Sequence, residues 1–246
     1  GKMYYFYFKD CIAQTNRSIT RAGTKGWLDS RGRFTTGWVT IDSSRNLARY
    51  INPNTGKWYV NTTAWIDGVN YRFNKYGNRV YDRTNEFKRS RYYLECDRTN
   101  GVMTVYTDSS KKYPIKTIRV SVGNPVTLTL KGTYKLTRSL RWQPLGQYGT
   151  HVVNGIFIHS VASGLQNGNN LPAGEYLKLG SPASHGCIRA CVADAKWVYE
   201  NCNGSTLRVF DGKYSADECY KGPLGRRPLT PLRGSKTFDP TDPDYQ

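Results

Sequence analysis

The sequence predicts a mainly β protein with an N-terminal module of β-hairpins, a second β-rich domain and one main helix. In the second domain, alternating or β-branched apolar residues indicate strands in five segments, at residues 102–107, 115–122, 126–137, 155–161 and 207–210. Residues 192–202 instead place apolar side chains on one face of a helix, and Gly204 is a stop signal for it. With 38% hydrophobic residues and 13% aromatic ones, the composition excludes collagen, a coiled coil and a disordered chain.

Aromatic residues dominate the first part of the chain, because 17 of the 33 fall within residues 1–90. They recur roughly every 20 residues, in the phrases Gly26-Trp27, Gly37-Trp38 and Gly56-Lys57-Trp58-Tyr59. Short aromatic strands separated by Asp-Gly and Asn-Pro turns are typical of hairpins. We therefore expect an array of hairpins in which each unit buries its aromatic face against the next.

These phrases resemble the choline-binding and glucan-binding repeats of Gram-positive surface proteins. The resemblance implies that the module binds wall polysaccharide or teichoic acid through exposed aromatic faces. In the alternative interpretation, Trp27, Trp38, Trp58 and Trp65 form the core of the hairpins and bind nothing. The sequence leaves both interpretations open.

The composition changes near residue 91 and again near residue 220. We expect the hairpin module over residues 1–90, the second domain over residues 91–219 and a C-terminal tail over residues 220–246. The tail holds five of the eleven prolines, so it either drapes over the domain or serves as a linker.

The chain carries 36 Lys and Arg against 18 Asp and Glu, a net charge of +18 that is spread along its length. Such a surplus favours polyanionic surroundings, which include nucleic acid, a membrane surface and anionic wall polymer. Nucleic acid is disfavoured because no basic stripe is concentrated on one element. No apolar run reaches the roughly 18 residues of a membrane-spanning helix. The chain begins at Gly1 without a Met, so we expect a processed product whose export signal lies outside this sequence.

The segment most informative about chemistry is residues 184–189, which read Ser-His-Gly-Cys-Ile-Arg. A second histidine, His159, ends the apolar strand expected 28 residues before Cys187. A cysteine nucleophile needs a nearby base because the thiolate is the attacking form, and a histidine is best matched to take its proton near neutral pH. His159 and His185 are therefore both candidate bases. Gly186 can adopt a backbone conformation in which successive N–H groups point at one spot, as in an oxyanion hole.

Metal binding is the alternative for the same residues. Thiolates and imidazoles suit zinc, so Cys187, Cys191, His159 and His185 form a conceivable ligand set. Their spacing is poor for a structural zinc site, and the six cysteines contain no CxxC pair. We therefore expect neither a metal nor another cofactor. In an oxidising exterior, a disulfide among Cys191, Cys202 and Cys219 would be the favoured pairing, because these residues lie near one helix, and a Cys11–Cys96 disulfide would join the two modules.

Residues 91–215 resemble the YkuD family of L,D-transpeptidase catalytic domains, whose signature is a strand histidine followed by Ser/Thr-His-Gly-Cys, a hydrophobic residue and Arg or Asn. The resemblance implies a β-sandwich fold with Cys187 as the nucleophile and His159 as the base, oriented by the main-chain oxygen of Ser160. It also implies that His185, Gly186 and the Cys187 amide line an oxyanion hole.

The same resemblance places Arg189 and Ser184 at the binding site of the acyl donor. Two departures from the family pattern stand out. The spacer between His159 and Ser184 is 24 residues, longer than in many members, which affects the expected substrate lid. Residues 129–132 read Thr-Leu-Lys-Gly where the family usually has Thr-Pro-x-Gly, a change that we expect to leave the chemistry untouched.

By resemblance, the activity is a peptidoglycan transpeptidation that forms 3→3 cross-links. The donor is a stem tetrapeptide, which releases D-Ala and leaves a thioester, and the acceptor is an amine of a second stem. The enzyme would act at the cell wall or cell surface and take part in wall biogenesis and cell shape. Two alternatives remain: an L,D-carboxypeptidase that uses the same site, and a wall-adhesion module whose catalytic domain has lapsed.

Overall fold

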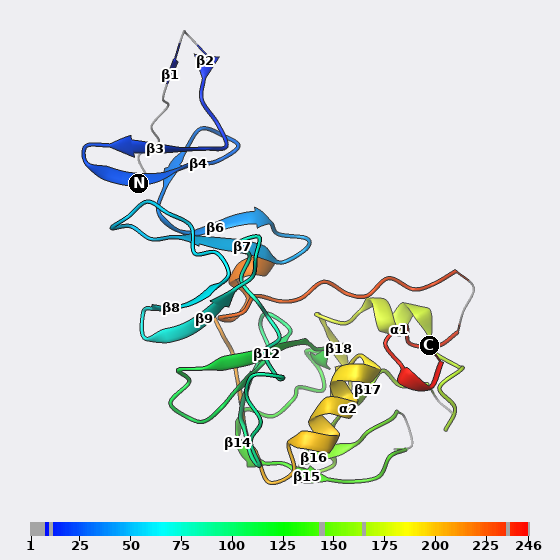
Figure 1. Ribbon diagram of the computed structural model, residues 1–246. Helices are drawn as coiled ribbons and strands as arrows, with labels where there is room; N and C mark the ends of the chain where they lie inside the picture. The colour runs from blue at the N-terminus through cyan, green and yellow to red at the C-terminus, as the bar shows by residue number, and fades with distance from the viewer. Residues whose placement is uncertain (1–7, 10–11, 143–145, 164–165, 235–236, 246) are drawn as a thin grey trace. The chain divides into compact units, whose positions relative to one another are not determined.

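The computed structural model describes residues 8–9, 12–142, 146–163, 166–234 and 237–245 (Figure 1). Strands make up 37% of the chain and helices 9%, which confirms the mainly β prediction. The chain divides into two compact units, Gly1–Val80 and Tyr81–Gln246. That residues 1–90 form a binding module and residues 91–219 a catalytic domain stays a prediction. None of the helices in these described ranges is long and apolar enough to cross a membrane.

The first unit is built from antiparallel hairpins. Its described strands are β1 (Phe8–Lys9), β2 (Ile12–Ala13), β3 (Arg17–Arg21), β4 (Thr24–Leu28), β5 (Phe34–Thr35), β6 (Gly37–Asp42), β7 (Leu47–Ile51), β8 (Thr62–Ile66) and β9 (Val69–Phe73). The β8–β9 hairpin shows why they form. Ile66 pairs with Val69 across the two-residue turn Asp67-Gly68, in which both residues have positive φ, as the favoured hairpin turn requires.

The aromatic residues of this unit fall into two groups. Trp38 packs edge-to-face on Tyr50 and Tyr71, with ring centroids 5.2 and 4.9 Å apart. Trp27 and Trp58 contact each other in the same way, at 5.1 Å. Trp65 differs, because 54% of its surface is exposed. Trp27, Trp38 and Trp58 therefore serve ring-to-ring packing, and more than half of the Trp65 surface faces solvent.

Two sheets of the second unit share one hydrophobic core. The five-stranded sheet has the order β12-β11-β10-β20-β14, and the four-stranded sheet has the order β15-β16-β17-β19. Their strands are β10 (Tyr93–Asp97), β11 (Val102–Tyr106), β12 (Pro114–Arg119), β14 (Gly132–Lys135), β15 (Thr137–Arg138), β16 (Thr150–Val153), β17 (Ile156–Ser160), β19 (Ile188–Ala190) and β20 (Thr206–Phe210). A short pair, β13 (Val122–Gly123) with β18 (Pro182–Ser184), completes the strands described in this unit.

The predicted helix is confirmed as α2 (Val192–Asn201), whose residues Val192, Ala195 and Val198 enter this core. The strand predicted over residues 126–137 is wrong in its first half. Asn124 bends the chain there, because its side-chain oxygen accepts the N–H groups of Val126 and Thr127, 2.9 Å away in each case. Such a turn takes the local hydrogen-bond donors that a strand would need.

The C-terminal segment packs against the second unit (Figure 1). Asp239 accepts the N–H of Val192 at 2.9 Å and so caps the start of α2. Thr237 donates its hydroxyl to the carbonyl of Asn169, and Asp242 accepts a side-chain N–H of Gln147 at 2.9 Å. Of the two arrangements expected from sequence, these bonds favour the one in which the tail drapes over the domain.

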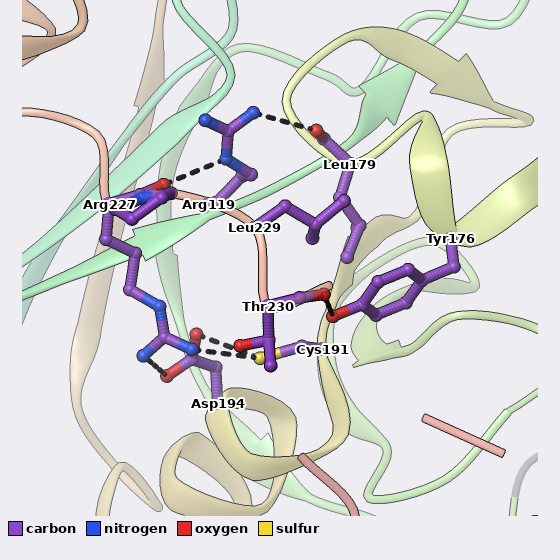
Figure 2. A pocket seen from close by; sticks show the side chains of 9 residues that line it. Arg119, Tyr176, Leu179, Cys191, Asp194, Arg227, Leu229 and Thr230 are labelled. Carbon is purple, nitrogen blue, oxygen red and sulfur yellow. Dashed lines mark hydrogen bonds and ion pairs between the residues drawn. The ribbon is translucent and has the colours of Figure 1, made fainter. Parts of the chain in front are cut away.

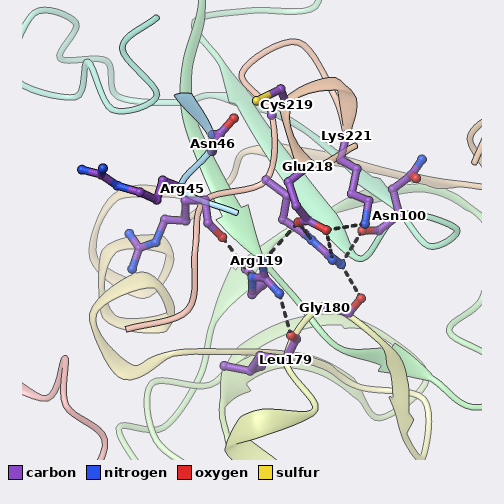
Figure 3. Close-up of polar contacts among 12 residues, drawn as sticks. Arg45, Asn46, Asn100, Arg119, Leu179, Gly180, Glu218, Cys219 and Lys221 are labelled. Atoms are coloured by element: carbon purple, nitrogen blue, oxygen red, sulfur yellow. Dashed lines mark hydrogen bonds and ion pairs between the residues drawn. The ribbon is translucent and has the colours of Figure 1, made fainter. Parts of the chain in front are cut away.

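A buried ion cluster anchors the start of this segment (Figure 3). The carboxylate of Glu218 binds Arg226 at 2.6 Å, Lys221 at 2.6 Å and Arg119 at 3.2 Å. Burial alone would raise the pKa of Glu218, but the hydrogen bonds from Arg226 and Lys221 and the nearby positive charges lower it to about 2. One carboxylate is therefore the counter-charge that three largely buried cations share.

We predict that Glu218→Gln lowers the free energy of unfolding at pH 7 by about 3 kcal/mol, because it leaves buried cations without their counter-charge. The folded pKa lies below the ordinary one, so the difference from wild type should persist above pH 4.5 and disappear as pH falls toward 2. Denaturant unfolding across this pH range measures it. The matched control is Glu200→Gln, which removes an exposed pair with Lys196 and should cost no more than about 0.5 kcal/mol. Equal effects of the two substitutions would contradict the prediction.

Candidate active site

The parallel pairing of β17 with β19 brings the two predicted motif segments together. Its register sets Ile158 opposite Ile188 and His159 opposite Arg189. Cys187 directly precedes β19, so it lies diagonal to His159 across the two strands. The two-residue Asn154-Gly155 turn, again with positive φ at both residues, fixes the hairpin that delivers β17.

His159 is held as a neutral imidazole with a defined tautomer. It is 3% exposed, and its Nδ1 lies 2.6 Å from the carbonyl oxygen of Ser160. A carbonyl oxygen only accepts hydrogen bonds, so Nδ1 carries the proton and Nε2 is the nitrogen able to accept one. Burial, and then the charge of Arg189, lower the pKa of His159 to about 4, although its bond to Ser160 favours the charged form. The side chain is therefore a neutral proton acceptor at pH 7.

Ser160 is positioned by residues that the sequence patterns did not single out. The N–H of Gln147 donates to Ser160 Oγ, and the N–H of Ser160 donates to the Gln147 carbonyl, at 2.9 Å each. Gly146 passes so close that a Cβ there would lie 2.6 Å from His159 Nδ1 and 2.8 Å from the Ser160 oxygen. Only a glycine fits beside the Nδ1–carbonyl bond.

The Ser-His-Gly-Cys turn is braced from within by Ser184. Its hydroxyl donates to the Cys187 carbonyl at 2.5 Å and accepts the Gly186 N–H at 3.2 Å. Ser184 is fully buried, so it shapes the turn and leaves no exposed surface for the substrate contact expected of it. Gly186 has a φ of +117°, which a residue with a side chain rarely adopts.

The same turn has two backbone N–H groups that stay unused. Within the described parts of the chain, neither His185 nor Cys187 donates its N–H to another atom. The Gly186 N–H is already taken by Ser184. An oxyanion hole in this turn would therefore be built from the N–H groups of His185 and Cys187, with Gly186 supplying the conformation.

Thr129, whose role the sequence did not indicate, contacts the turn from outside. Its hydroxyl donates to the Gly186 carbonyl at 2.7 Å and accepts the N–H of Gly123 at 2.8 Å. Leu130, where the family pattern usually has proline, is 44% exposed. Within that phrase, the threonine hydroxyl is therefore the group that contacts the turn.

Arg189 and Glu175 form an ion pair at the far end of the motif, 2.7 Å between Nη1 and Oε2. Glu175 comes from the short helix α1 (Ala173–Leu177), which lies inside the long spacer between His159 and Ser184. Arg189 is 8% exposed, and its Nε is a buried donor without a hydrogen-bond partner among the described residues. The guanidinium therefore keeps unused donor capacity in the site.

Cys187 is the accessible one of the five described cysteines, and its thiol lies 3.9 Å from the Gly155 carbonyl. Cys96, Cys191, Cys202 and Cys219 are buried and form no disulfide with one another, so the disulfide expected among the last three is wrong. Burial raises the pKa of Cys96 and of Cys202 to about 12, which makes both unreactive. Cys11 lies outside the described residues.

A small pocket elsewhere in the unit contains Cys191 (Figure 2). Its thiol donates to Asp194 at 3.2 Å, and Asp194 also pairs with Lys116 at 3.1 Å and Arg227 at 3.4 Å. Burial, and next the charge of Asp194, raise the pKa of the Cys191 thiol. Throughout the described ranges, no group of three or more His, Cys, Asp or Glu side chains could hold a metal ion.

Comparison with known proteins gives consistent matches. The family model of the YkuD L,D-transpeptidase catalytic domain matches residues 91–217. A 24-residue stretch is 75% identical to YciB of Bacillus subtilis (strain 168), a protein provisionally named an L,D-transpeptidase, and covers 10% of this chain and 12% of that protein.

Two solved structures are similar to this chain at low identity. L,D-transpeptidase from Stackebrandtia nassauensis is 18% identical with a TM-score of 0.39, over 50% of this chain and 56% of that one. L,D-transpeptidase 3 from Mycobacterium tuberculosis, in complex with a faropenem-derived adduct, is 17% identical with a TM-score of 0.39, over 49% and 60%. The chain thus spans little more than half the length of these structures.

We predict that the His159 imidazole titrates with a midpoint near pH 4, well below the ordinary 6.5, because burial disfavours its charged form. NMR of the imidazole resonances across pH 3–8 measures the midpoint. Gly146→Ala should move it toward 6.5, since the added methyl displaces the ring from its seat. Gly174→Ala is the matched control, because a Cβ there meets nothing within 4 Å. A wild-type midpoint near 6.5 would contradict the prediction.

Proposed function

Because the chain belongs to the YkuD family of L,D-transpeptidase catalytic domains, whose members act on peptidoglycan stem peptides, we propose that it forms 3→3 cross-links through a thioester on Cys187. The observation that carries this proposal is the pairing of β17 with β19, whose register puts the one accessible described thiol diagonal to a neutral, tautomer-fixed His159. The activity of the whole protein, its substrates and its partners are all part of the proposal.

In the first half-reaction, the Cys187 thiol gives its proton to His159 Nε2, and the sulfur attacks the carbonyl carbon between the third stem residue and the terminal D-Ala. The carbonyl oxygen becomes an oxyanion, which the N–H groups of His185 and Cys187 stabilise. His159 then returns the proton to the departing nitrogen. The C–N bond breaks, D-Ala leaves as the free amine, and the acyl group remains as a thioester.

In the second half-reaction, the side-chain amine of a second stem attacks the thioester carbon. His159 takes a proton from that amine, the C–S bond breaks, and the proton passes to the Cys187 sulfur. The product is an amide that joins the third residues of two stems. The thioester retains the acyl activation of the broken amide, so the exchange is close to balanced and needs no separate energy source.

Arg189 supports recognition of the acyl donor in this scheme. A stem peptide presents carboxylate groups, and Arg189, which keeps 8% of its surface exposed, supplies a positive charge that attracts one. Glu175 holds the guanidinium in place without using its Nε. Arg189 therefore binds donor substrate, and Ser184 and Ser160 act by shaping the backbone around Cys187 and His159.

We predict that incubation of the protein with disaccharide tetrapeptides yields cross-linked dimers and free D-Ala, as measured by mass spectrometry of the muropeptides. His159→Ala should lower turnover by a factor of about 10² to 10⁴, the usual contribution of a general base. His185→Ala should be milder, because that exposed residue acts through its backbone N–H. Trimmed monomers without dimers would identify a carboxypeptidase. Unchanged muropeptides would reject the enzyme and favour a wall-adhesion protein.

We also propose that the first unit holds the enzyme on wall polysaccharide or teichoic acid, at the cell wall or surface. The family is typically associated with the wall, and the net charge of +18 favours an anionic polymer. Trp65 is the exposed ring of this unit best suited to stack on a sugar or a quaternary ammonium group. Trp27, Trp38 and Trp58 contact other rings and support the hairpins.

We predict that Trp65→Ala reduces the fraction of protein that sediments with insoluble wall material, by several-fold at limiting wall concentration. Loss of an aromatic face removes both apolar contact and cation–π attraction. Tyr214→Ala, at a ring of the second unit that is 68% exposed against 54% for Trp65, is the control and should change nothing. If the two substitutions have the same effect, the first unit is not the wall-binding element.

A further inference from the structure

We propose that Thr129 positions the Cys187 N–H as an oxyanion-hole donor, through its hydrogen bond to the Gly186 carbonyl. The inference rests on the proposed acyl-transfer function. Its geometric basis is that the Gly186 carbonyl and the Cys187 N–H belong to one peptide unit, which is planar and points the two groups in opposite directions. Fixing the oxygen at one end of this unit therefore fixes the direction of the N–H at the other.

The Thr129 hydroxyl is oriented without ambiguity. Thr129 is 1% exposed, and its Oγ1 lies 2.8 Å from the Gly123 nitrogen and 2.7 Å from the Gly186 oxygen. An N–H only donates and a carbonyl only accepts, so the hydroxyl proton must point at Gly186. Hydrogen bonds in such a chain strengthen one another. The bond to the Gly186 carbonyl therefore polarises the Gly186–Cys187 peptide, which makes the Cys187 N–H a better donor.

Gly186 needs such a brace because it lacks a side chain and has a φ of +117°. A glycine in this region leaves the following peptide unit free to rotate. Ser184 fixes the peptide before Gly186 by accepting its N–H. Thr129 fixes the peptide after it, so the two hydroxyls hold Gly186 from both sides.

The segment that carries Thr129 is itself fastened to the turn. The N–H of Asn124 donates to the Ser184 carbonyl at 2.9 Å. The chain then crosses so closely over Gly123 that a Cβ there would lie 2.0 Å from the Thr127 carbonyl oxygen and 2.5 Å from the Thr129 nitrogen. This close crossing brings Oγ1 of Thr129 within reach of the Gly123 N–H and the Gly186 oxygen together.

Thr129→Val tests the inference, because it keeps the shape of the side chain and removes the hydroxyl. We expect the rate of D-Ala release from the tetrapeptide to fall about tenfold in kcat with little change in KM, since removing an oxyanion donor outright costs roughly 10² to 10³ and here only its alignment is lost. Alkylation of Cys187 by iodoacetamide, followed by peptide mass mapping, should keep its wild-type rate. Displacement of iodide creates no oxyanion, so the alkylation rate depends on the Cys187 thiol and His159 but not on the oxyanion hole.

Two further variants complete the design. Thr129→Ser retains the hydroxyl and should restore D-Ala release to within about twofold of wild type. Thr127→Val removes a hydroxyl from the same segment, one that lies 3.1 Å from the Asn124 side chain and 3.4 Å from the Ser184 carbonyl but does not bond Gly186, and should leave both rates unchanged. All rates are measured well below the melting temperature of each variant, and the ratio of acyl transfer to alkylation corrects for inactive protein.

Each outcome supports or overturns the inference. A selective loss of D-Ala release in Thr129→Val that Thr129→Ser restores supports it. Equal loss of both reactions overturns it and shows that the hydroxyl only keeps the turn folded, and an unaffected Thr129→Val overturns it as well. If wild-type Cys187 is alkylated normally but never releases D-Ala, the proposed function fails and the inference falls with it.

Discussion

The site depends on one piece of main-chain pairing, the parallel ladder between β17 and β19. The two strands are separated by the long spacer that holds α1, so they meet only because Ile158 and Ile188 are both fully buried in the shared core. The side-chain period of two then sets His159 opposite Arg189 and leaves Cys187 at the mouth of the ladder. A slip of one residue would turn His159 away from the thiol, so core packing and catalytic geometry impose the same register.

Burial at this register determines the protonation state of His159. Folding removes His159 from water, and because Arg189 adds positive charge beside it, the imidazole stays neutral at the pH where it must accept a proton. The cation is tolerated there because Glu175 pairs with it. Carboxylates pair with buried cations elsewhere in the second unit too. Glu218 and Asp194 each form ion pairs with Lys and Arg side chains. The net charge of +18 therefore coexists with a second unit in which the buried cations Arg83, Lys116, Arg189, Lys221 and Arg226 have carboxylate partners.

Sequence patterns predicted the parts of the site whose signals are local. The Ser-His-Gly-Cys phrase, the strand histidine and the helix α2 each depend on neighbouring residues, and each lies where expected. Thr129, Gln147 and Glu175 were missed because their roles depend on contacts across 57, 13 and 14 residues of chain. The role of Gly146 was missed for another reason. Its φ is ordinary, and it is needed because a side chain there would occupy the space of the His159 ring. The false strand over residues 126–131 arose because a side-chain turn at Asn124 overrode an apolar alternation.

Glycine serves the site in two physically different ways, and the difference explains how a turn of four residues becomes rigid. Gly186 is required for its φ, while a Cβ there would find only ordinary contacts at 3.8 Å or more. Gly123 and Gly146 are required for closeness, because each lets another backbone or ring approach within about 3 Å of where its Cβ would lie. Flexibility at Gly186 is thus offset by tight packing of neighbours at the other two. The C-terminal segment extends this bracing, because Asp242 holds the side chain of Gln147, whose backbone holds Ser160. The nucleophile turn and its base are therefore fixed by parts of the chain that contribute no reacting atom.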